Sequence, residues 1–256
     1  MSKQVFDVAL VDADCLVYRL GFAAASGGLD WPTTETIFRN YIELIRDNPT
    51  FESKDIHLCF TNSGKPNYRD QFDPEGLYKT SRKKKTGIKP LWIQEMRDLY
   101  YNDHMTYSIS PSEGEADDLI CIGANLFPYG TTVIISSDKD LLQIPGYHAP
   151  WLIGKKIDTT YSVSEIKGHF NFYSQLLTGD KADDIQGIKG IGPVRASNYL
   201  SHLKSEAEMF STVLDVYNNA YKDTHSVDQI ADMIYNRGNL LYLRKSTSDS
   251  WTPPTL

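Results

Sequence analysis

Residues 5–12 read VFDVALVD, and this apolar run decides how the rest of the sequence is interpreted. A short run of this kind, bounded by an aspartate, is typical of a buried β-strand. Similar runs occur at 56–61 (IHLCFT), 105–109 (MTYSI) and 132–136 (TVIIS). Helical apolar patterns lie between them at 33–46, 91–101 and 115–127. Strands that alternate with helices predict an α/β fold, with a mostly parallel sheet and helices on both faces.

Composition limits the classes of protein to which the chain can belong. It has 256 residues, 41% of them hydrophobic, which is enough for a sizeable core. The formal net charge of −7 argues against binding of nucleic acid or membranes through overall charge. A local group of positive charges can still attract such a partner, because binding depends on the charges near the contact. We expect no membrane partner, since no apolar stretch approaches about 18 residues and no signal peptide opens the chain. Cys15, Cys59 and Cys121 lack metal-site spacing, which predicts reduced thiols in a cytoplasm.

Two regions depart from the alternating pattern. The segment 63–90 lacks an apolar period, and from Lys79 to Lys89 it carries only cations among its charged residues. After about residue 162 the pattern becomes helical, interrupted by GDKADDIQGIKGIGPVRA at 179–196. We therefore predict a sheet-containing core over 1–175, with the cationic insert at 63–90. An all-helical region should follow over 176–256.

Acidic residues gather where the predicted strands end. Four of them crowd into EGEADDLI at 113–120, directly before an apolar run. Two charges about 5 Å apart repel by roughly 3 kcal/mol at an effective dielectric of about 20, so something must offset the repulsion. The carboxyl ends of parallel strands share one edge of a sheet, where sites form. The carboxylates expected to meet there are Asp12, Glu115, Asp117, Asp118, Asp138, Asp140, Asp180 and Asp183.

Each acidic motif also has a structural explanation when it is taken alone. Ser112 and Glu115 fit a capping box, Ser137 fits a helix start, and GDKADD fits a turn. The joint pattern favours a metal site, because so many carboxylates in one cleft cannot stay ionised without cations. Oxygen ligands suit Mg²⁺ or Mn²⁺, and no cluster of histidines and cysteines indicates zinc. We predict two or more such ions.

Two divalent ions about 3.5–4 Å apart are suited to phosphoryl transfer, since they activate a water and stabilise the leaving oxygen. Phosphoryl transfer would also explain the cationic insert at 63–90. Lys79 and Arg82 are predicted to stabilise charge that develops on a phosphate, and Tyr78 to stack on a base. Lys83 is assigned to DNA binding, although Lys83, Lys84 and Lys85 equally fit a solvated loop.

The stretch GIKGIGPVRA at 187–196 predicts a contact with the DNA backbone. Gly190 and Gly192 would allow the chain to approach a phosphate closely, and Pro193 suits the first position of a helix whose N–H groups face the anion. Such a hairpin holds duplex DNA without reading its sequence. The residues assigned to this contact are Gly187, Lys189, Gly190, Gly192 and Arg195.

These motifs together resemble the 5′ nucleases, which include flap endonucleases and bacteriophage 5′-to-3′ exonucleases. The resemblance runs through VDAD (11–14), YKTSR (78–82), EGEADDLI, ISSDKDLL (135–142) and the glycine hairpin. It implies a PIN-like core, an arch over the active site and a helix-hairpin-helix. Carried over, the eight acids named above match the family's metal ligands, Lys79 and Arg82 its arch cations, and Tyr78 the neighbouring aromatic residue. One departure is Asn62, where many relatives have an aspartate.

The expected activity is metal-dependent hydrolysis near 5′ ends, nicks or flaps of duplex DNA, including removal of RNA from RNA–DNA hybrids. The resemblance also implies a monovalent cation such as K⁺ at the hairpin. Since no room remains for a polymerase, we expect the free-standing phage type, active in the cytoplasm of an infected bacterium alongside replication proteins. Two alternatives remain at this point, a PIN-type ribonuclease and a DNA-binding factor with a dead site.

Overall fold

The computed structural model describes residues 3–62, 67–83, 87–101, 103–110, 114–151 and 157–255. They divide into two compact units. The first unit comprises 1–65, 86–141 and 146–163, and the second comprises 66–85, 142–145 and 164–256. Most of the predicted cationic insert therefore belongs to the second unit. The predicted boundary at residue 175 lies inside a continuous helix, α6 (Glu165–Thr178), so the compact units divide the chain differently from the sequence pattern.

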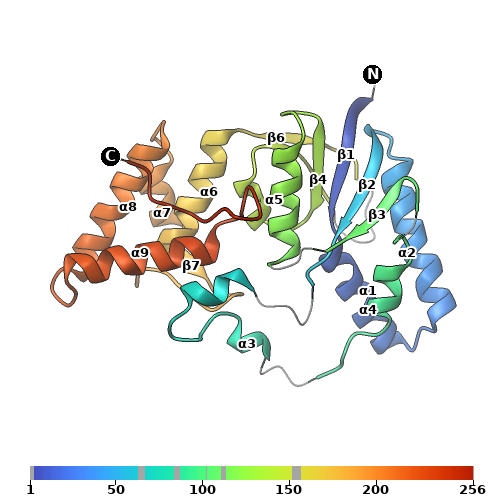
Figure 1. The fold of residues 1–256 in the computed structure, drawn as a ribbon, viewed down its shortest axis with the longest axis horizontal. Helices are drawn as coiled ribbons and strands as arrows, with labels where there is room; N and C mark the ends of the chain where they lie inside the picture. Colours follow the sequence, from blue (N-terminus) through green and yellow to red (C-terminus); the bar gives the residue numbers. More distant parts are fainter. Residues whose placement is uncertain are drawn as a thin grey trace. The chain divides into compact units, whose positions relative to one another are not determined.

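The first unit is built on a six-stranded sheet within the described residues, in the order β3-β2-β1-β4-β5-β6 (Figure 1). The strands from β3 to β5 run parallel, and β6 is antiparallel to β5. Their bounds are β1 (Gln4–Asp12), β2 (Phe51–Cys59), β3 (Thr106–Ile109), β4 (Thr132–Ser136), β5 (Gly146–Pro150) and β6 (Tyr161–Val163). The predicted mostly parallel sheet is confirmed.

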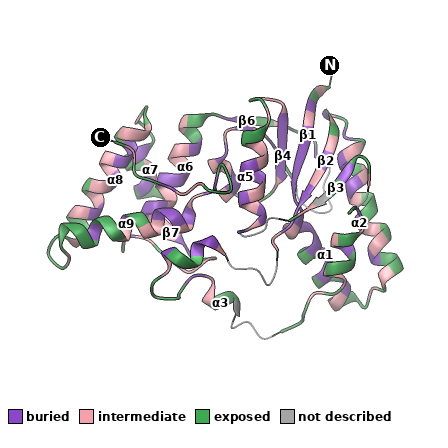
Figure 2. Ribbon diagram, viewed as in Figure 1, coloured by how far each residue is buried: buried purple, intermediate pink, exposed green. Residues whose placement is uncertain are grey.

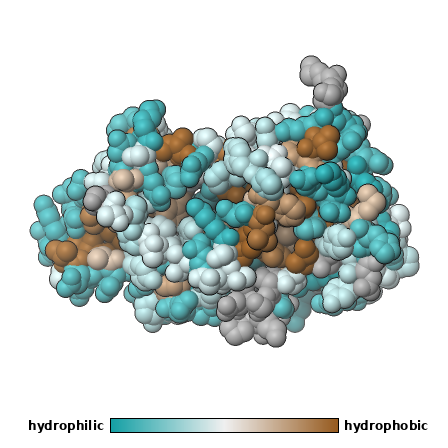
Figure 3. Space-filling model, turned by 45° about the horizontal axis from the view of Figure 1, so that its top comes forward, coloured by the Kyte–Doolittle hydropathy of each residue, from teal (hydrophilic) through white to brown (hydrophobic). Residues whose placement is uncertain are grey.

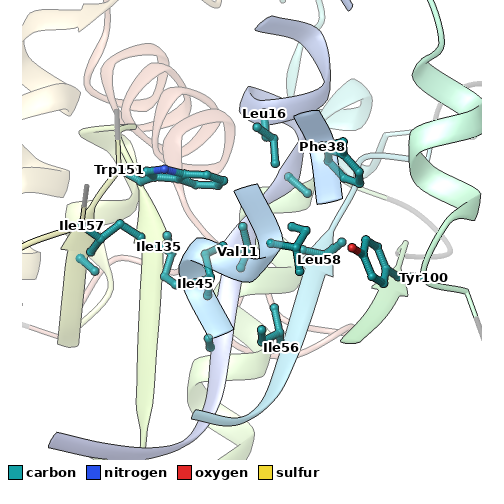
Figure 4. Packing of buried hydrophobic residues seen from close by; sticks show 14 of the residues in the cluster. Val11, Leu16, Phe38, Ile45, Ile56, Leu58, Tyr100, Ile135, Trp151 and Ile157 are labelled. Atoms are coloured by element: carbon teal, nitrogen blue, oxygen red, sulfur yellow. The ribbon is translucent and has the colours of Figure 1, made fainter. Parts of the chain in front are cut away.

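Helices cover both faces of this sheet, as predicted. On one face lie α1 (Ala13–Gly27), α2 (Trp31–Arg46) and α4 (Ile93–Asp98). Figure 4 shows Leu16 and Phe38 from these helices packed against Val11 and Leu58 of the strands. On the other face lies α5 (Ala116–Leu126), where Gly123 sits so close to Leu10 that an added Cβ would lie 3.0 Å from its Cδ2. Alternate residues of β1 thus face opposite helical layers.

The second unit is mainly helical. Its helices are α3 (Thr80–Lys83), α6, α7 (Pro193–Leu200), α8 (Glu206–Tyr221) and α9 (Val227–Leu241), with the short 3-10 helix η1 (Tyr68–Phe72) and the paired strands β7 (Gly179–Asp180) and β8 (Ile185–Gln186). A second 3-10 helix, η2 (Asp140–Gln143), spans the change from one unit to the other. Arg69 of η1 is buried and donates to the carbonyl oxygens of Leu240 at 3.0 Å and Tyr242 at 2.8 Å. These bonds explain why η1 belongs with α9.

The buried strands stand out in Figure 2, where β4 is buried from Thr132 to Ile135 and β1 from Val8 to Asp12. The surface drawn in Figure 3 is mostly hydrophilic, with apolar patches between hydrophilic residues. Within the described ranges, no helix is long and apolar enough to cross a membrane.

Candidate active site

Asp12 ends β1 and begins α1, and both of its carboxylate oxygens accept hydrogen bonds. The backbone N–H of Cys15 donates to Oδ1 at 3.2 Å, and the hydroxyl of Ser136 donates to Oδ2 at 2.8 Å. Ser136 is the last residue of β4, the strand beside β1. Asp12 is only 4% exposed, so its carboxylate is fixed at the carboxyl edge of the sheet.

Asp138 and Asp140 continue from this point as a chain of hydrogen bonds. The Asp138 N–H donates to Ser136 Oγ at 2.8 Å, and the Asp140 N–H donates to Asp138 Oδ1 at 2.9 Å. Ser136 therefore joins Asp12 to the segment that carries Asp138. Two acids that are far apart in the sequence meet at neighbouring strand ends, as the parallel sheet predicted.

The acids at the start of α5 have different surroundings. Asp118 is fully buried, and its Oδ2 accepts from the Glu115 N–H at 3.1 Å. This bond is part of a capping box at the start of α5 that pairs Glu115 with Asp118. The capping box considered from the sequence paired Ser112 with Glu115, and Ser112 lies outside the described residues. The N–H of Ala116 donates to Thr61 Oγ1 at 3.0 Å, which ties α5 to the end of β2. Asp117, which lies between Ala116 and Asp118 in the sequence, is half-buried.

Electrostatics links Asp117 to the other acids. Burial raises the pKa of the Asp12 carboxyl, and repulsion from Asp138 raises it further. The pKa of the Cys15 thiol is raised first by burial, then by Asp12, and additionally by Asp138 and Asp117. Charges act on a thiol this way only at short range. Asp12, Asp117 and Asp138, from three separate segments, therefore lie near enough to Cys15 for their charges to raise the pKa of its thiol.

The chemistry of these side chains fits a hard divalent cation, which would offset the repulsion between them. A cavity of about 10 Å³ beside Asp12 and Ser136, also lined by Arg19 and Trp151, has about the space of one water. Among the described residues, no three histidine, cysteine, aspartate or glutamate side chains form a group ready to hold a metal.

A supporting network beside Asp12 was not anticipated from the sequence. Asp14 Oδ1 pairs with Arg97 Nη2 at 2.9 Å, and Asp14 Oδ2 accepts from the Thr61 N–H at 3.0 Å. The guanidinium of Arg97 also lies 5.3 Å from the centre of the Phe60 ring. Since Thr61 binds Ala116, the network joins α1, α4, β2 and α5. The one feature of the sequence that pointed to this network was Asp14, the second aspartate of VDAD.

In the second unit, the predicted catalytic cations contact a predicted metal ligand. Lys79 Nζ lies 3.3 Å from Asp183 Oδ2, and Arg82 Nη2 lies 2.5 Å from Asp183 Oδ1. The hydroxyl of Tyr78 donates to Asp183 Oδ2 at 3.5 Å. Tyr78 is only 6% exposed and belongs to the core of this unit, so a base could stack on its ring only after a rearrangement.

The remaining acid of this segment, Asp180, is buried in β7 and its Oδ1 accepts from the Ala182 N–H at 2.7 Å. Asp180 and Asp183 belong to the second unit, whereas the other predicted ligands belong to the first. Their convergence with the first group stays a prediction. Lys83 ends α3, and its side chain lies outside the described part of the structure.

The glycine hairpin has a defined shape. The Ile188 N–H donates to the Leu177 carbonyl at 2.8 Å, which fixes the hairpin to α6. Gly190 has φ +83°, a conformation that favours glycine, and its carbonyl accepts from Arg195 Nη1 at 2.9 Å. Gly192 begins α7 without a side-chain cap. After Pro193, which has no N–H, the backbone N–H groups of Val194 and Arg195 lie in the first turn of α7, and no side chain of the N-cap residue accepts from them. Donors of this kind suit an anion.

The other residues assigned to DNA contact differ in exposure. Lys189 and Arg195 are exposed, as a backbone contact requires. Gly187 instead packs against α6, because an added Cβ would overlap the carbonyl group of Thr178. This close approach explains by itself why residue 187 is a glycine. A contact between Gly187 and DNA stays a prediction.

Comparison with known proteins identifies the family. A model described as 5′-3′ exonuclease, N-terminal resolvase-like domain, matches residues 7–171. The chain belongs to this family. Within it, the chain is 27% identical over 244 residues to a 5′-3′ exonuclease of Mycoplasma pneumoniae, covering 86% of this chain and 78% of that protein.

Two further similarities concern the wider family. The DNA polymerase I of Caldicellulosiruptor bescii is 25% identical over 235 residues, and the chain spans only 26% of its length. The fold is similar to that of the T5 5′-exonuclease with bound zinc, with a TM-score of 0.61 and 16% identity over 93% of this chain and 89% of that one. Recognition of the 5′ nuclease family from the sequence motifs is confirmed.

Proposed function

We propose that the chain is a metal-dependent 5′ nuclease that hydrolyses phosphodiester bonds near 5′ ends, nicks or flaps of duplex DNA. The observation that carries this proposal is the joining of Asp12 to Asp138 through Ser136, in a chain of the 5′-3′ exonuclease family. Mg²⁺ or Mn²⁺ suits these oxygen ligands. Bound divalent ions would supply an activated water and offset charge on the departing oxygen.

The chain's own residues have three proposed tasks. Asp12, Asp117 and Asp138 hold the cations, helped by the hydrogen bonds that orient Asp12. Lys79 and Arg82 bind the phosphate and stabilise the charge that develops on it during cleavage. Planar guanidinium groups such as that of Arg82 bind phosphate oxygens in pairs, which adds orientation to attraction.

The glycine hairpin is proposed to hold duplex DNA. The uncapped start of α7 and the exposed Lys189 and Arg195 offer N–H groups and positive charge to a phosphate. A duplex held in this way presents an end to the nuclease. Unpairing that end costs a few kcal/mol, less for frayed ends and flaps, so ends are preferred over internal duplex. K⁺ at the hairpin carbonyls is part of the same proposal.

Comparing cleavage of a labelled 5′-flap duplex, a blunt duplex and single-stranded RNA, each with Mg²⁺ and with EDTA, tests the proposal. We expect metal-dependent release of short products from the 5′ end of the flap, and slow cleavage of the RNA. Faster cleavage of RNA would support a PIN-type ribonuclease instead. Tight binding of the flap without hydrolysis would indicate a DNA-binding factor. Product lengths separate exonuclease from flap endonuclease activity.

A further inference from the structure

The second unit contains a cavity of about 300 Å³ that the proposed function does not use. Its walls are the turn that follows η1, the strand β8 and one side of α9, and its described lining residues all belong to this unit. Here η1 and α9 lie side by side (Figure 1). Among the residues assigned to metal or DNA, Tyr78 alone contributes to the described lining. A cavity of this volume is at the lower end of the range for ligand sites in proteins.

Much of the lining is apolar, and it comes from three separate segments. Phe72 and Ile185 are buried, whereas Leu77 keeps 40% of its surface exposed. Met233 and Leu240 of α9 are half-buried. Exposed apolar surface in a concave site is stabilised when an apolar group covers it. The occupant should therefore supply at least one apolar side chain.

The wall formed by the turn after η1 is fixed by the protein itself. Asp73 accepts from the Leu77 N–H at 3.0 Å and from the Tyr78 N–H at 2.8 Å, so its two carboxylate oxygens close the turn. Arg69, which precedes the turn, donates to carbonyl oxygens at the end of α9. The two sides of the cavity are therefore tied to each other, and a ligand would meet a preformed site.

The charged side chains that line the cavity are mostly acidic. The carboxylates are those of Asp73, Glu75, Asp184 and Asp232. Two of them, Glu75 and Asp232, are exposed. Among the described lining residues the one cation is Arg237, which lies 5.7 Å from the centre of the Tyr217 ring and donates to its hydroxyl at 3.4 Å. This excess of negative charge repels the phosphates of DNA and attracts a cationic ligand.

Three amide side chains, those of Gln186, Gln229 and Asn236, also line the cavity. An amide carries both donors and an acceptor, the groups that pair with a peptide backbone. An apolar wall beside exposed carboxylates and amides matches a peptide in which an apolar side chain stands next to a lysine or an arginine. Charge complementarity thus favours a basic peptide over nucleic acid or an acidic peptide.

We propose that this cavity binds a short basic segment of a partner protein. A leucine or phenylalanine of that segment fills the cavity, and a neighbouring arginine or lysine pairs with Glu75 and Asp232. Ion pairs at exposed carboxylates contribute modestly, so the apolar side chain supplies most of the affinity. The inference goes beyond the proposed function, because no step of DNA cleavage uses the cavity.

Methionine methyl groups provide a local test of binding, because Met233 lines the cavity while Met209 lies in the core of the same unit. We would follow the NMR signals of isotope-labelled methionine methyl groups in the whole chain, in EDTA and without DNA. The probes are short synthetic peptides with leucine or phenylalanine at the centre and arginine or lysine on either side. They should shift the Met233 signal, identified by its loss in Met233→Leu, and leave the Met209 signal in place.

Two sets of control peptides separate the contributions of charge and apolar surface. Replacing the central residues by alanine, or the flanking cations by glutamate, should abolish the shift. An equal shift with the alanine peptides would indicate a site for cations alone, and an equal shift with the glutamate peptides would indicate apolar binding without charge recognition. Either result would overturn the proposal, as would the absence of a shift with every basic peptide.

The acidic residues are tested by combining Glu75→Gln with Asp232→Asn. Loss of two exposed ion pairs should weaken peptide binding about fivefold. Asp228→Asn is the matched control, since Asp228 is an exposed acid of the same helix that is not part of the described lining, and it should leave the affinity nearly unchanged. Equal affinities of the double variant and the control would overturn the proposal. Urea denaturation confirms that both proteins fold.

Two other occupants would give different results. A Met233 signal that shifts with protein concentration alone would show that a second copy of the chain covers the cavity. A shift caused by a flap duplex and reversed by the peptide would assign the cavity to DNA. Either outcome would overturn the proposal. Cleavage of the flap with Mg²⁺ tests the nuclease separately, so failure of one proposal leaves the other intact.

Discussion

Arg97 on α4 and Asp14 on α1 form an ion pair in which Arg97 Nη2 lies 2.9 Å from Asp14 Oδ1. Asp14 follows Asp12, the residue that ends β1, by two positions in the sequence. Both side chains of the ion pair are mostly buried, with exposures of 11% and 19%. The other Asp14 oxygen accepts from the N–H of Thr61, whose hydroxyl accepts from the start of α5. The pair therefore stabilises the junction of the elements that carry Asp12 and Asp117.

Arg97→Met should destabilise the first unit, because it leaves the Asp14 carboxylate partly buried without its cation. We expect a loss of about 2 kcal/mol in the free energy of unfolding, below the range for fully buried pairs. Urea denaturation measures it. Lys54→Met is the control, since Lys54 pairs with Asp7 at 2.6 Å on the surface and should have little effect. Equal stability of both variants would show that the buried pair contributes little.

Asp138→Asn should separate metal binding from folding. The charge of Asp138 raises the pKa of the buried Asp12 carboxyl, so the two carboxylates repel each other. Removing the charge of Asp138 removes a repulsion that the folded protein must bear when Asp12 is ionised. The melting temperature of the metal-free protein at neutral pH should therefore rise. The rise in melting temperature caused by Mg²⁺ should shrink or disappear, and cleavage should be lost while DNA binding survives. Near-normal turnover with an unchanged Mg²⁺ effect would contradict the assignment of Asp138.

Much of the sheet could be predicted because its strands are short apolar runs that end in polar residues. Residues 5–12 and 132–136 correspond closely to β1 and β4. The strand β2 begins five residues before the predicted 56, where Glu52 and Lys54 interrupt the apolar pattern. Neither α1 nor β5 was anticipated, since α1 follows β1 without a turn and β5 has glycine at one end and proline at the other.

The candidate site could be predicted in part, for a physical reason. Parallel topology sends strand ends to one edge, so the meeting of Asp12 and Asp138 followed from the pattern. Pairing between charges was not readable, because the sequence does not say whether Asp183 faces a metal or a lysine. Burial was equally hidden at Tyr78, whose neighbours in YKTSR are polar while its ring belongs to the core.

Lys79→Ala should slow the chemical step far more than it weakens binding. If Lys79 stabilises charge that develops on the scissile phosphate, its loss should lower single-turnover cleavage by about 10²-fold or more. Its loss as a simple phosphate contact would cost only a few-fold in affinity. Rapid-quench cleavage and anisotropy on the same flap substrate measure the two effects, with Lys54→Ala as a control for charge. Equal losses in rate and affinity would reduce Lys79 to a binding residue.

The two glycines that flank the hairpin should respond differently to the same substitution. At Gly187 an added Cβ would overlap backbone atoms of Thr178, so Gly187→Ala should destabilise the second unit by about 3 kcal/mol. At Gly192 an added Cβ meets no atom within 4 Å, so Gly192→Ala should cost less than about 1 kcal/mol in stability.

The effect of Gly192→Ala on DNA decides whether the hairpin holds the duplex backbone. If the start of α7 binds a phosphate of the DNA backbone, a methyl group at residue 192 should obstruct the close approach of that phosphate. The affinity for a duplex formed by a DNA stem-loop should then fall about tenfold. Anisotropy in EDTA at several salt concentrations measures it, with urea denaturation to confirm folding. The substitution removes no charge, so the slope of affinity against salt should stay nearly constant while affinity falls. A folded Gly192→Ala protein with unchanged affinity would place the duplex contact elsewhere in the chain.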